Sequence, residues 1–177
     1  MEITAVEPFL AYYGSVRART ERVVACIPPE RLEWADRPGA FTLGDQVRHI
    51  AATERWMFAE NVAGRPSRYP GCGRELADGP DAVWEYLRRM HAESVEIFRV
   101  LTPDDLRRRV ATPAGAPLAA WKWLRAMVEH EVHHRAHVYM MLGMLGVQTP
   151  PIYGLTSEEV LERSLPPEDA PPADQNA

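Results

Sequence analysis

The sequence predicts an all-α protein, and the architecture we expect is a four-helix bundle with short extra helices. Prolines leave four long proline-free intervals, residues 9–27, 39–65, 81–102 and 118–149. Proline ends helices because its ring clashes with the preceding turn and it lacks an amide hydrogen. No segment shows the sustained alternation of apolar and polar residues that a half-buried strand needs. Four such helices can bury their apolar stripes against one another.

The first three intervals each carry a specific sign of a helix. In the first, one narrow stripe keeps a spacing of three and four residues: Phe9, Tyr13, Val16, Thr20, Val23 and Ile27. The second opens on a capping-box-like sequence, in which Thr42 caps the helix and Asp45 stands at its third position. The third has a stripe of the same kind, formed by Trp84, Leu87, His91, Val95 and Phe98.

Short helices are also expected after Thr102 and after Thr156. Both positions combine a capping hydroxyl with acidic residues in the turn that follows. We assign residues 1–165 to a single domain. The remaining segment, residues 166–177, is rich in proline and in acidic or small residues, so we expect a disordered tail.

Composition excludes several classes of function. A chain of 177 residues with 46% hydrophobic content can form one domain with a substantial core. The formal net charge of -5 gives no basic surface for a phosphate backbone, so we expect no nucleic-acid partner. No apolar run reaches transmembrane length and no charged-then-apolar leader follows Met1, so we expect no membrane association. Cys26 and Cys72 lie far apart, which suits a reducing compartment, and we expect a cytoplasmic protein.

The last interval holds four of the six histidines within eight residues. Neutral imidazole is the commonest protein ligand for borderline transition metals. At about 100° per residue, His130 and His134 fall about 40° apart, inside the apolar stripe, whereas His137 lies on its flank and His133 towards solvent. That stripe is formed by Trp123, Met127, Val138, Met141, Leu142 and Leu145.

The spacing of His130 and His134 predicts a metal site. Two imidazoles that point into a core are expensive to bury unless they are hydrogen-bonded or bind a metal. The alternative is a pair of core histidines satisfied by ordinary hydrogen bonds. A metal would need at least one more ligand from another helix. The candidates are His49 and His91: His91 lies at the centre of its own stripe, and His49 shares a mixed face with Thr53 and Trp56. Helical geometry leaves this choice open.

Several runs of the sequence carry a resemblance to a known family. The first is Ile27-Pro28-Pro29-Glu30-Arg31-Leu32 followed by Phe41-Thr42-Leu43-Gly44-Asp45-Gln46-Val47-Arg48-His49-Ile50-Ala51. The second is His130-Glu131-Val132-His133-His134-Arg135-Ala136-His137-Val138-Tyr139, followed by Leu145-Gly146-Val147 and Pro150-Pro151-Ile152-Tyr153-Gly154-Leu155. With these runs almost the whole chain resembles the DinB-like family of small bacterial metal-binding four-helix bundles. The first run is similar to that family's passage into its second helix, and the second to its last helix and exit loop.

By this resemblance the metal ligands are His49, His130 and His134, which decides the choice above in favour of His49. His91 then becomes a core or cavity residue. The sequence departs from the family at His137, where a glutamine is common, and this leaves the role of that position open.

The resemblance also implies an activity. Three imidazoles around a divalent ion leave positions for water or substrate, as in catalytic sites. Zinc is the first choice of metal, and nickel and iron suit three imidazoles as well. The bound ion would activate a water or a low-molecular-weight thiol, so the expected enzyme is a hydrolase or a thiol S-transferase acting on a small molecule. The family also implies a homodimer.

Two other interpretations compete with this one. Residues 130–134 satisfy the His-Glu-x-x-His pattern of zinc peptidases, in which Glu131 would be the general base. Against it stand the absence of a predicted strand to bind a peptide and of a Gly-x-x-His sequence after His134. Without that role, Glu131 is a surface acid pairing with Arg135 or an acceptor that orients an imidazole. The other interpretation is a bundle that binds metal for stability or sensing without catalysis.

Overall fold

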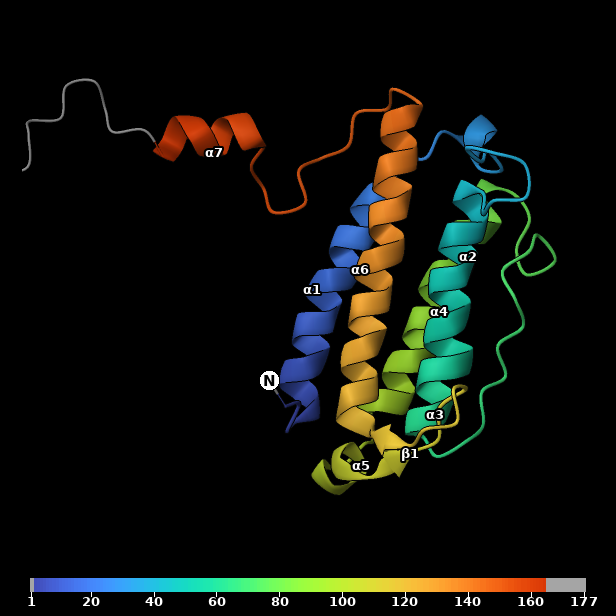
Figure 1. The fold of residues 1–177 in the computed structure, drawn as a ribbon, viewed down its shortest axis with the longest axis vertical. Coiled ribbons are helices and arrows are strands. Elements are labelled where there is room, and N and C mark those ends of the chain that lie inside the picture. Colours follow the sequence, from blue (N-terminus) through green and yellow to red (C-terminus); the bar gives the residue numbers. More distant parts are fainter. Residues whose placement is uncertain (1, 165–177) are drawn as a thin grey trace, which may run out of the picture.

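Four long helical rods lie side by side along one axis (Figure 1). The structure, a computed structural model, describes residues 2–164. Three of the rods are α1 (Val6–Val24), α4 (Pro80–Arg99) and α6 (Ala120–Met144). The remaining rod runs without a break through α2 (Leu43–Thr53), the π-helical segment η2 (Glu54–Ala59) and α3 (Glu60–Val62). The predicted four-helix bundle is confirmed.

The helix ends follow local chemistry. Helix α2 begins with the expected capping box, in which Thr42 accepts from the Asp45 amide and the Asp45 carboxylate accepts from the Thr42 amide. Helix α1 begins before its proline-free interval, because Pro8 lies in its first turn, where a helix tolerates proline. The π-helical turn within the second rod was not predicted. No proline or glycine marks it in the sequence.

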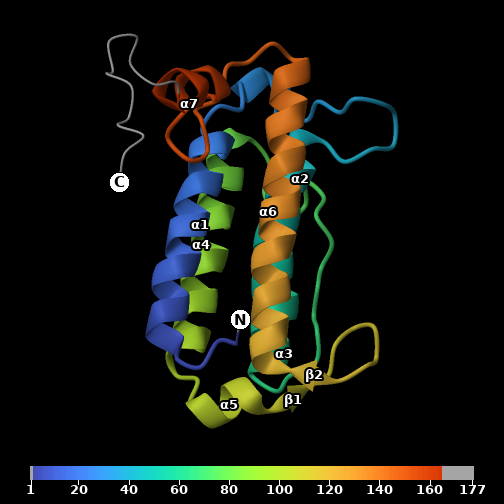
Figure 2. The same cartoon turned by 60° about the vertical axis from the view of Figure 1, so that its left-hand side comes forward.

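The bundle has an unusual order of helix directions. Helix α1 packs against α4 and α6, and α2 packs against the same two helices from the other side. Figures 1 and 2 show that α1 and α6 run one way, whereas α2 and α4 both run the other way. Because α2 and α4 are parallel, the segment that joins them, residues 63–79, must return along the length of the bundle. It does so on the outside, beside α2 (Figure 1).

The smaller elements lie at the ends of the bundle. The two extra helices are confirmed as α5 (Pro103–Arg107), with a capping box at Thr102, and α7 (Ser157–Ser164), capped from Thr156. A 3-10 turn, η1 (Pro29–Arg31), follows α1. The prediction of no strands was wrong in one detail: β1 (Arg109–Val110) pairs antiparallel with β2 (Leu118–Ala119). Two residues are too few for alternation to be recognised. The predicted tail, residues 166–177, lies outside the described residues.

The buried face of α4 is rotated from the predicted stripe. Leu87 and Phe98 are buried as expected, whereas Trp84, His91 and Val95 are only partly buried. The centre of the face is formed by Val83, Leu87, Met90, Ser94 and Phe98. The reason is that α4 packs against both α1 and α2, which covers a wider arc than one stripe. Within residues 2–164, none of the helices combines the length and apolarity needed to cross a bilayer.

A charged cluster lies in the middle of this apolar interior. The Arg17 side chain on α1 is 3% exposed and pairs with Glu54 of η2 and, at 2.9 Å from Nη2 to Oε2, with Glu131 of α6. Both carboxylates are 2% exposed. Burial alone would lower the pKa of Arg17, but the charges of Glu131 and Glu54 raise it. The guanidinium therefore stays charged and joins three helical rods.

Hydrogen bonds satisfy the two carboxylates of this cluster, whereas Nε and Nη1 of Arg17 have no hydrogen-bond partner among the described residues. The Tyr13 hydroxyl donates to Glu131 Oε2 at 2.8 Å, and the Thr20 hydroxyl donates to Glu131 Oε1 at 2.6 Å. On the other side, His91 Nδ1 donates to Glu54 Oε1 at 2.8 Å. Both oxygens of each carboxylate therefore have a partner. Buried charges are tolerated only when they are paired and hydrogen-bonded in this way.

Replacing Arg17 by methionine should lower the free energy of unfolding by about 3–5 kcal/mol, because two buried carboxylates would lose their cation. Chemical denaturation measures the change. The matched control is Arg99→Met, which removes an exposed pair with Glu96 and should change stability by less than about 1 kcal/mol. Equal losses in the two variants would contradict a structural role for the buried cluster.

Candidate metal centre

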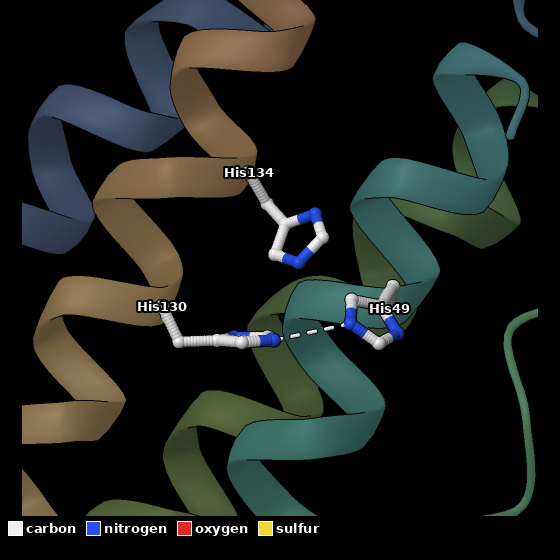
Figure 3. Close-up of side chains that lie close together, drawn as sticks. All are labelled: His49, His130 and His134. Atoms are coloured by element: carbon white, nitrogen blue, oxygen red, sulfur yellow. Dashed lines mark hydrogen bonds between the residues drawn. The ribbon is translucent and has the colours of Figure 1, made fainter.

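Three histidines from two antiparallel helices converge on one point. His49 projects from α2, and His130 and His134 project from successive turns of α6 (Figure 3). One ring nitrogen from each can be chosen so that all three lie within 4.8 Å of one another, and together the three residues can hold a metal ion. Nε2 of His49 lies 3.1 Å from Nε2 of His130. Nitrogens bound to one tetrahedral zinc ion at about 2.0–2.1 Å are about 3.3 Å apart, so this pair already has a suitable separation.

The position of the site follows from the packing of α6. The fully buried face of this helix is centred on Leu124, Glu131, Arg135 and Leu142 rather than on the predicted stripe. His130 and His134 therefore lie at the edge of the buried face, turned towards α2, and are only partly buried. The prediction that they share one face is confirmed, but that face is the α2 side of the interior and not its centre.

All three rings are held in the neutral form. Burial, reinforced by the neighbouring histidines, lowers the pKa of His130 to about 4 and that of His134 to about 3. Burial also lowers the pKa of His49. A histidine must be neutral to bind a metal. At neutral pH this cluster therefore offers lone pairs without first having to lose protons.

Two polar side chains contact the outer nitrogens of the histidines. Gln46 Oε1 lies 2.7 Å from His134 Nδ1, and the Tyr69 hydroxyl lies 2.7 Å from His49 Nδ1. Burial, with the help of the neighbouring Cys72 thiol, raises the pKa of Tyr69. The sequence analysis missed both contacts. Gln46 stands one turn before His49 and could have been noticed, whereas nothing in the sequence links Tyr69 to the site.

The remaining histidines lie apart from this centre. His91 packs edge-on against Tyr13, with ring centroids 5.3 Å apart, and donates to Glu54 in the buried charged cluster. The structure thus brings His49, and not His91, together with the α6 pair. His133 and His137 contact each other at 4.2 Å between centroids on the outer side of α6. His137 borders the site through its contact with the His134 ring at 5.5 Å.

Glu131 points away from the three histidines. It is buried, and both carboxylate oxygens are engaged by side chains of α1. This placement argues against the expectation that Glu131 is a general base beside the metal, and it corrects the interpretation of Glu131 as a surface acid. Arg135 is also buried and donates to the Val16 carbonyl oxygen, so it is not a surface partner for Glu131. The cause is the rotation of the buried face of α6 described above.

A cavity of about 400 Å³ opens beside the centre. Its inner wall includes His134, Gln46 and His137. Its other lining residues include the charged Asp36 and Arg37 and the apolar Phe41, Met140, Met141 and Met144. A volume of several hundred Å³ is typical of small-molecule sites. Of the three histidines, His134 lines this space, which can admit a small ligand.

Comparison with known proteins identifies the family. The model of the DinB superfamily matches residues 12–138, which is more than half of the chain and includes all three histidines. The chain belongs to the DinB superfamily. Among curated proteins, none matches the sequence.

Solved structures of DinB-like proteins share this fold. A DinB-like protein from Bacillus cereus is 20% identical, with a TM-score of 0.70, and the match covers 84% of this chain and 97% of that one. YfiT from Bacillus subtilis, described as a probable metal-dependent hydrolase with an unusual four-helix bundle topology, is 18% identical, with a TM-score of 0.65 and coverage of 81% and 89%. A mycothiol-dependent maleylpyruvate isomerase is 15% identical, with a TM-score of 0.60; the match covers 76% of this chain but only 60% of that enzyme.

The lowered histidine pKa values predict how the stability of the metal-free protein depends on pH. In the unfolded chain these imidazoles take up protons below about pH 6.5, whereas in the folded protein His130 and His134 stay neutral down to about 4 and about 3. The unfolded state therefore binds more protons in this interval, and the free energy of unfolding should fall as the pH is lowered from about 6.5 towards about 4.

Chemical denaturation in the presence of a chelator, repeated across this interval, measures the effect. His130→Gln and His134→Gln should each weaken the pH dependence. His133→Gln, which alters an exposed ring on the same helix, is the matched control. A slope that is unchanged in both centre variants would contradict the placement of these rings in a desolvated cluster.

Proposed function

We propose that this protein is a metal-dependent enzyme in which His49, His130 and His134 hold a divalent cation, with zinc as the first choice. The reaction we propose is attack on a small-molecule electrophile by a water or a low-molecular-weight thiol, as in a hydrolase or a thiol S-transferase. The observation that carries the proposal is the convergence of three neutral imidazoles beside a cavity. The homodimer and the cytoplasmic location expected from the sequence stay predictions.

The donor set fits such a cation. Three imidazoles are the protein ligands of known catalytic zinc sites, which keep a position open for water or substrate. Within residues 2–164, the metal-binding group consists of these three histidines and includes no carboxylate or thiolate. An incomplete protein shell beside a ligand-sized cavity favours catalysis over a purely structural role.

The residues of the site have distinct tasks in this proposal. A cation held here would act as a Lewis acid that lowers the pKa of a bound water or thiol. The three histidines bind the cation in their neutral form. The apolar wall, which includes Phe41 and Met141, would exclude water from the body of the substrate, and flexible methionine side chains can adapt to its shape.

The names of the structural neighbours agree with both versions of the reaction. YfiT is described as a probable metal-dependent hydrolase, and the maleylpyruvate isomerase as dependent on the thiol mycothiol. A zinc peptidase finds less support, because Glu131 would have to act as its base and instead bonds to α1. A metal-binding protein without catalysis is distinguished from an enzyme by the measurements below.

Metal binding is tested by the stoichiometry and affinity of each histidine variant. Wild-type protein should bind one zinc ion per chain, and His49→Ala, His130→Ala and His134→Ala should each lose affinity by more than about 100-fold, beyond the loss typical of an outer partner. His91→Ala and His133→Ala, which alter rings outside the centre, are the controls and should keep the metal. Competition with a chromophoric chelator provides the affinities. Full retention of metal by the three centre variants would overturn the proposed site.

Catalysis is tested by turnover of the metal-loaded protein. We expect reaction of a small electrophile with water or with one of several low-molecular-weight thiols, abolished by a chelator, restored by added metal and lost in His134→Ala. Product formation can be followed by mass spectrometry, with ester and amide substrates in the same screen. Stoichiometric metal binding without turnover on any of these would favour the non-catalytic alternative.

A further inference from the structure

The side chain of Gln46 contacts the candidate metal centre and also lines the cavity beside it. It projects from α2, is 7% exposed and shares the cavity wall with His134. A carboxamide has an oxygen that accepts hydrogen bonds and a nitrogen that donates two. The two ends of this side chain can therefore serve different partners.

The oxygen end of Gln46 is engaged by the metal centre. Oε1 lies 2.7 Å from Nδ1 of His134. Because Oε1 can only accept, Nδ1 carries the hydrogen of the neutral ring and the lone pair remains on Nε2. A neutral imidazole that binds a cation through Nε2 needs an acceptor for its Nδ1–H group, so metal binding favours the same orientation of the carboxamide.

The nitrogen end of Gln46 is left without a protein partner. Within residues 2–164, the contact with His134 is the only hydrogen bond of this side chain, and none joins Nε2 to an acceptor. Buried donors nearly always have a partner, supplied by protein, water or ligand. Since more than nine-tenths of Gln46 is buried and the side chain lines the cavity, the acceptor for its N–H groups must come from the cavity, as water or as a ligand.

The other polar side chains of the cavity select ligands less sharply. Arg37 already donates from Nη1 to Oδ2 of Asp36 at 2.9 Å, so these two charges cancel. Burial lowers the pKa of His137, and a neutral imidazole can either donate or accept. The free end of Gln46 can only donate. It therefore requires an acceptor atom in the ligand and does not by itself require a negative charge.

We propose that Gln46 is a substrate-binding residue whose carboxamide nitrogen donates to a carbonyl or carboxylate oxygen of the small-molecule electrophile, while its oxygen positions His134. The apolar body of that molecule would lie against the methionines of the cavity. The inference rests on the proposed function for calling this ligand a substrate, and it adds the chemical class. A buried donor discriminates strongly against an analogue that lacks the matching oxygen, because the donor would then stay unpaired.

Three probes of similar shape test the donor: benzamide carries a carbonyl oxygen, benzoate a carboxylate, and toluene neither. Each is titrated into zinc-saturated and into metal-free protein, and ¹H–¹⁵N correlation NMR follows the side-chain amide of Gln46, assigned by its loss in Gln46→Leu. Benzamide, benzoate or both should shift this signal, and Gln46→Leu should weaken their binding by about 10–100-fold, as expected for an unpaired buried group. The affinity for toluene should not fall.

The matched control is Gln148→Leu, the same substitution at an exposed glutamine outside the cavity lining. It should leave the affinity for all three probes unchanged. Comparing each probe between wild type and variant cancels the differences in hydrophobicity among the probes. An effect confined to benzamide identifies a neutral carbonyl as the group bound, and an effect confined to benzoate identifies a carboxylate.

Gln46→Glu separates the two ends of the side chain, because it keeps an acceptor for His134 and removes the donors. Long-range ¹H–¹⁵N NMR on metal-free protein should show Nδ1–H for His134 in the wild type and in Gln46→Glu, and loss of this preference in Gln46→Leu. Zinc binding should weaken by about 10–100-fold in Gln46→Leu only. Benzamide binding should weaken in both variants.

Benzamide and benzoate that bind without shifting the Gln46 amide, or that bind Gln46→Leu as tightly as the wild type, would overturn the inference. Absence of binding by all three probes would overturn it as well, because the cavity would then take no ligand of this class. A wild-type protein that takes up no zinc would instead overturn the proposed function. The titrations of metal-free protein would still decide whether Gln46 binds an oxygen acceptor in the cavity.

Discussion

The pairing of one buried guanidinium with two buried carboxylates fixes the geometry on which the rest of the structure depends. Arg17 joins Glu54 and Glu131, which belong to the two helical rods that carry the candidate ligands. Glu54 follows His49 by little more than one turn, and Glu131 is the direct neighbour of His130. The separation of the two rods at the level of the centre is therefore set from the opposite side of the bundle, by a side chain that does not touch the histidines.

Joining helices through buried charges costs free energy, because the charged groups must lose their hydration. Apolar side chains of the same volume would hold the rods at least as firmly, because buried ion pairs lose much of their hydration. Apolar contacts, however, permit helices to slide and rotate by small amounts, whereas buried carboxylates whose oxygens are all engaged accept one register. Tyr13 and Thr20 on α1 complete the bonding of Glu131, so a shift of α6 would leave a charge unsatisfied. A site made of converging rings benefits from this rigidity.

Much of the fold could be predicted from sequence because its signals are local. Proline positions delimit the helices, and Thr42 with Asp45 marks a helix start within four residues. The sharing of one face by His130 and His134 also follows from a single helix. By contrast, the choice of His49 over His91 depends on which faces of different helices meet, and periodicity within one helix contains no such information; the family resemblance supplied it.

Three further features could not be predicted from the sequence, because periodicity within one helix does not show how that helix packs against the rest of the chain. The apolar stripe assigned to α6 was displaced from its true buried face, because polar residues were assumed to lie outside, whereas Glu131 and Arg135 lie inside. The π-helical turn has no compositional mark. The contact between Tyr69 and His49 joins a loop to a helix across 20 residues of chain, and it exists only because the parallel arrangement of α2 and α4 sends that loop back past the centre.

The separation of these partners along the chain also has a consequence during protein synthesis. Thr20 and Glu131 are 111 residues apart, and Tyr13 and Glu131 are 118 apart. While the chain is still emerging from the ribosome, α1 and α2 can be complete before their partners on α6 have been translated. These partners are Glu131 for α1, and His130 and His134 for α2. Until α6 has been synthesised, the amino-terminal helices keep exposed the apolar surface that α6 later covers. The packing of α6 against them is therefore a late folding step, and it is comparatively slow because its contacts are non-local.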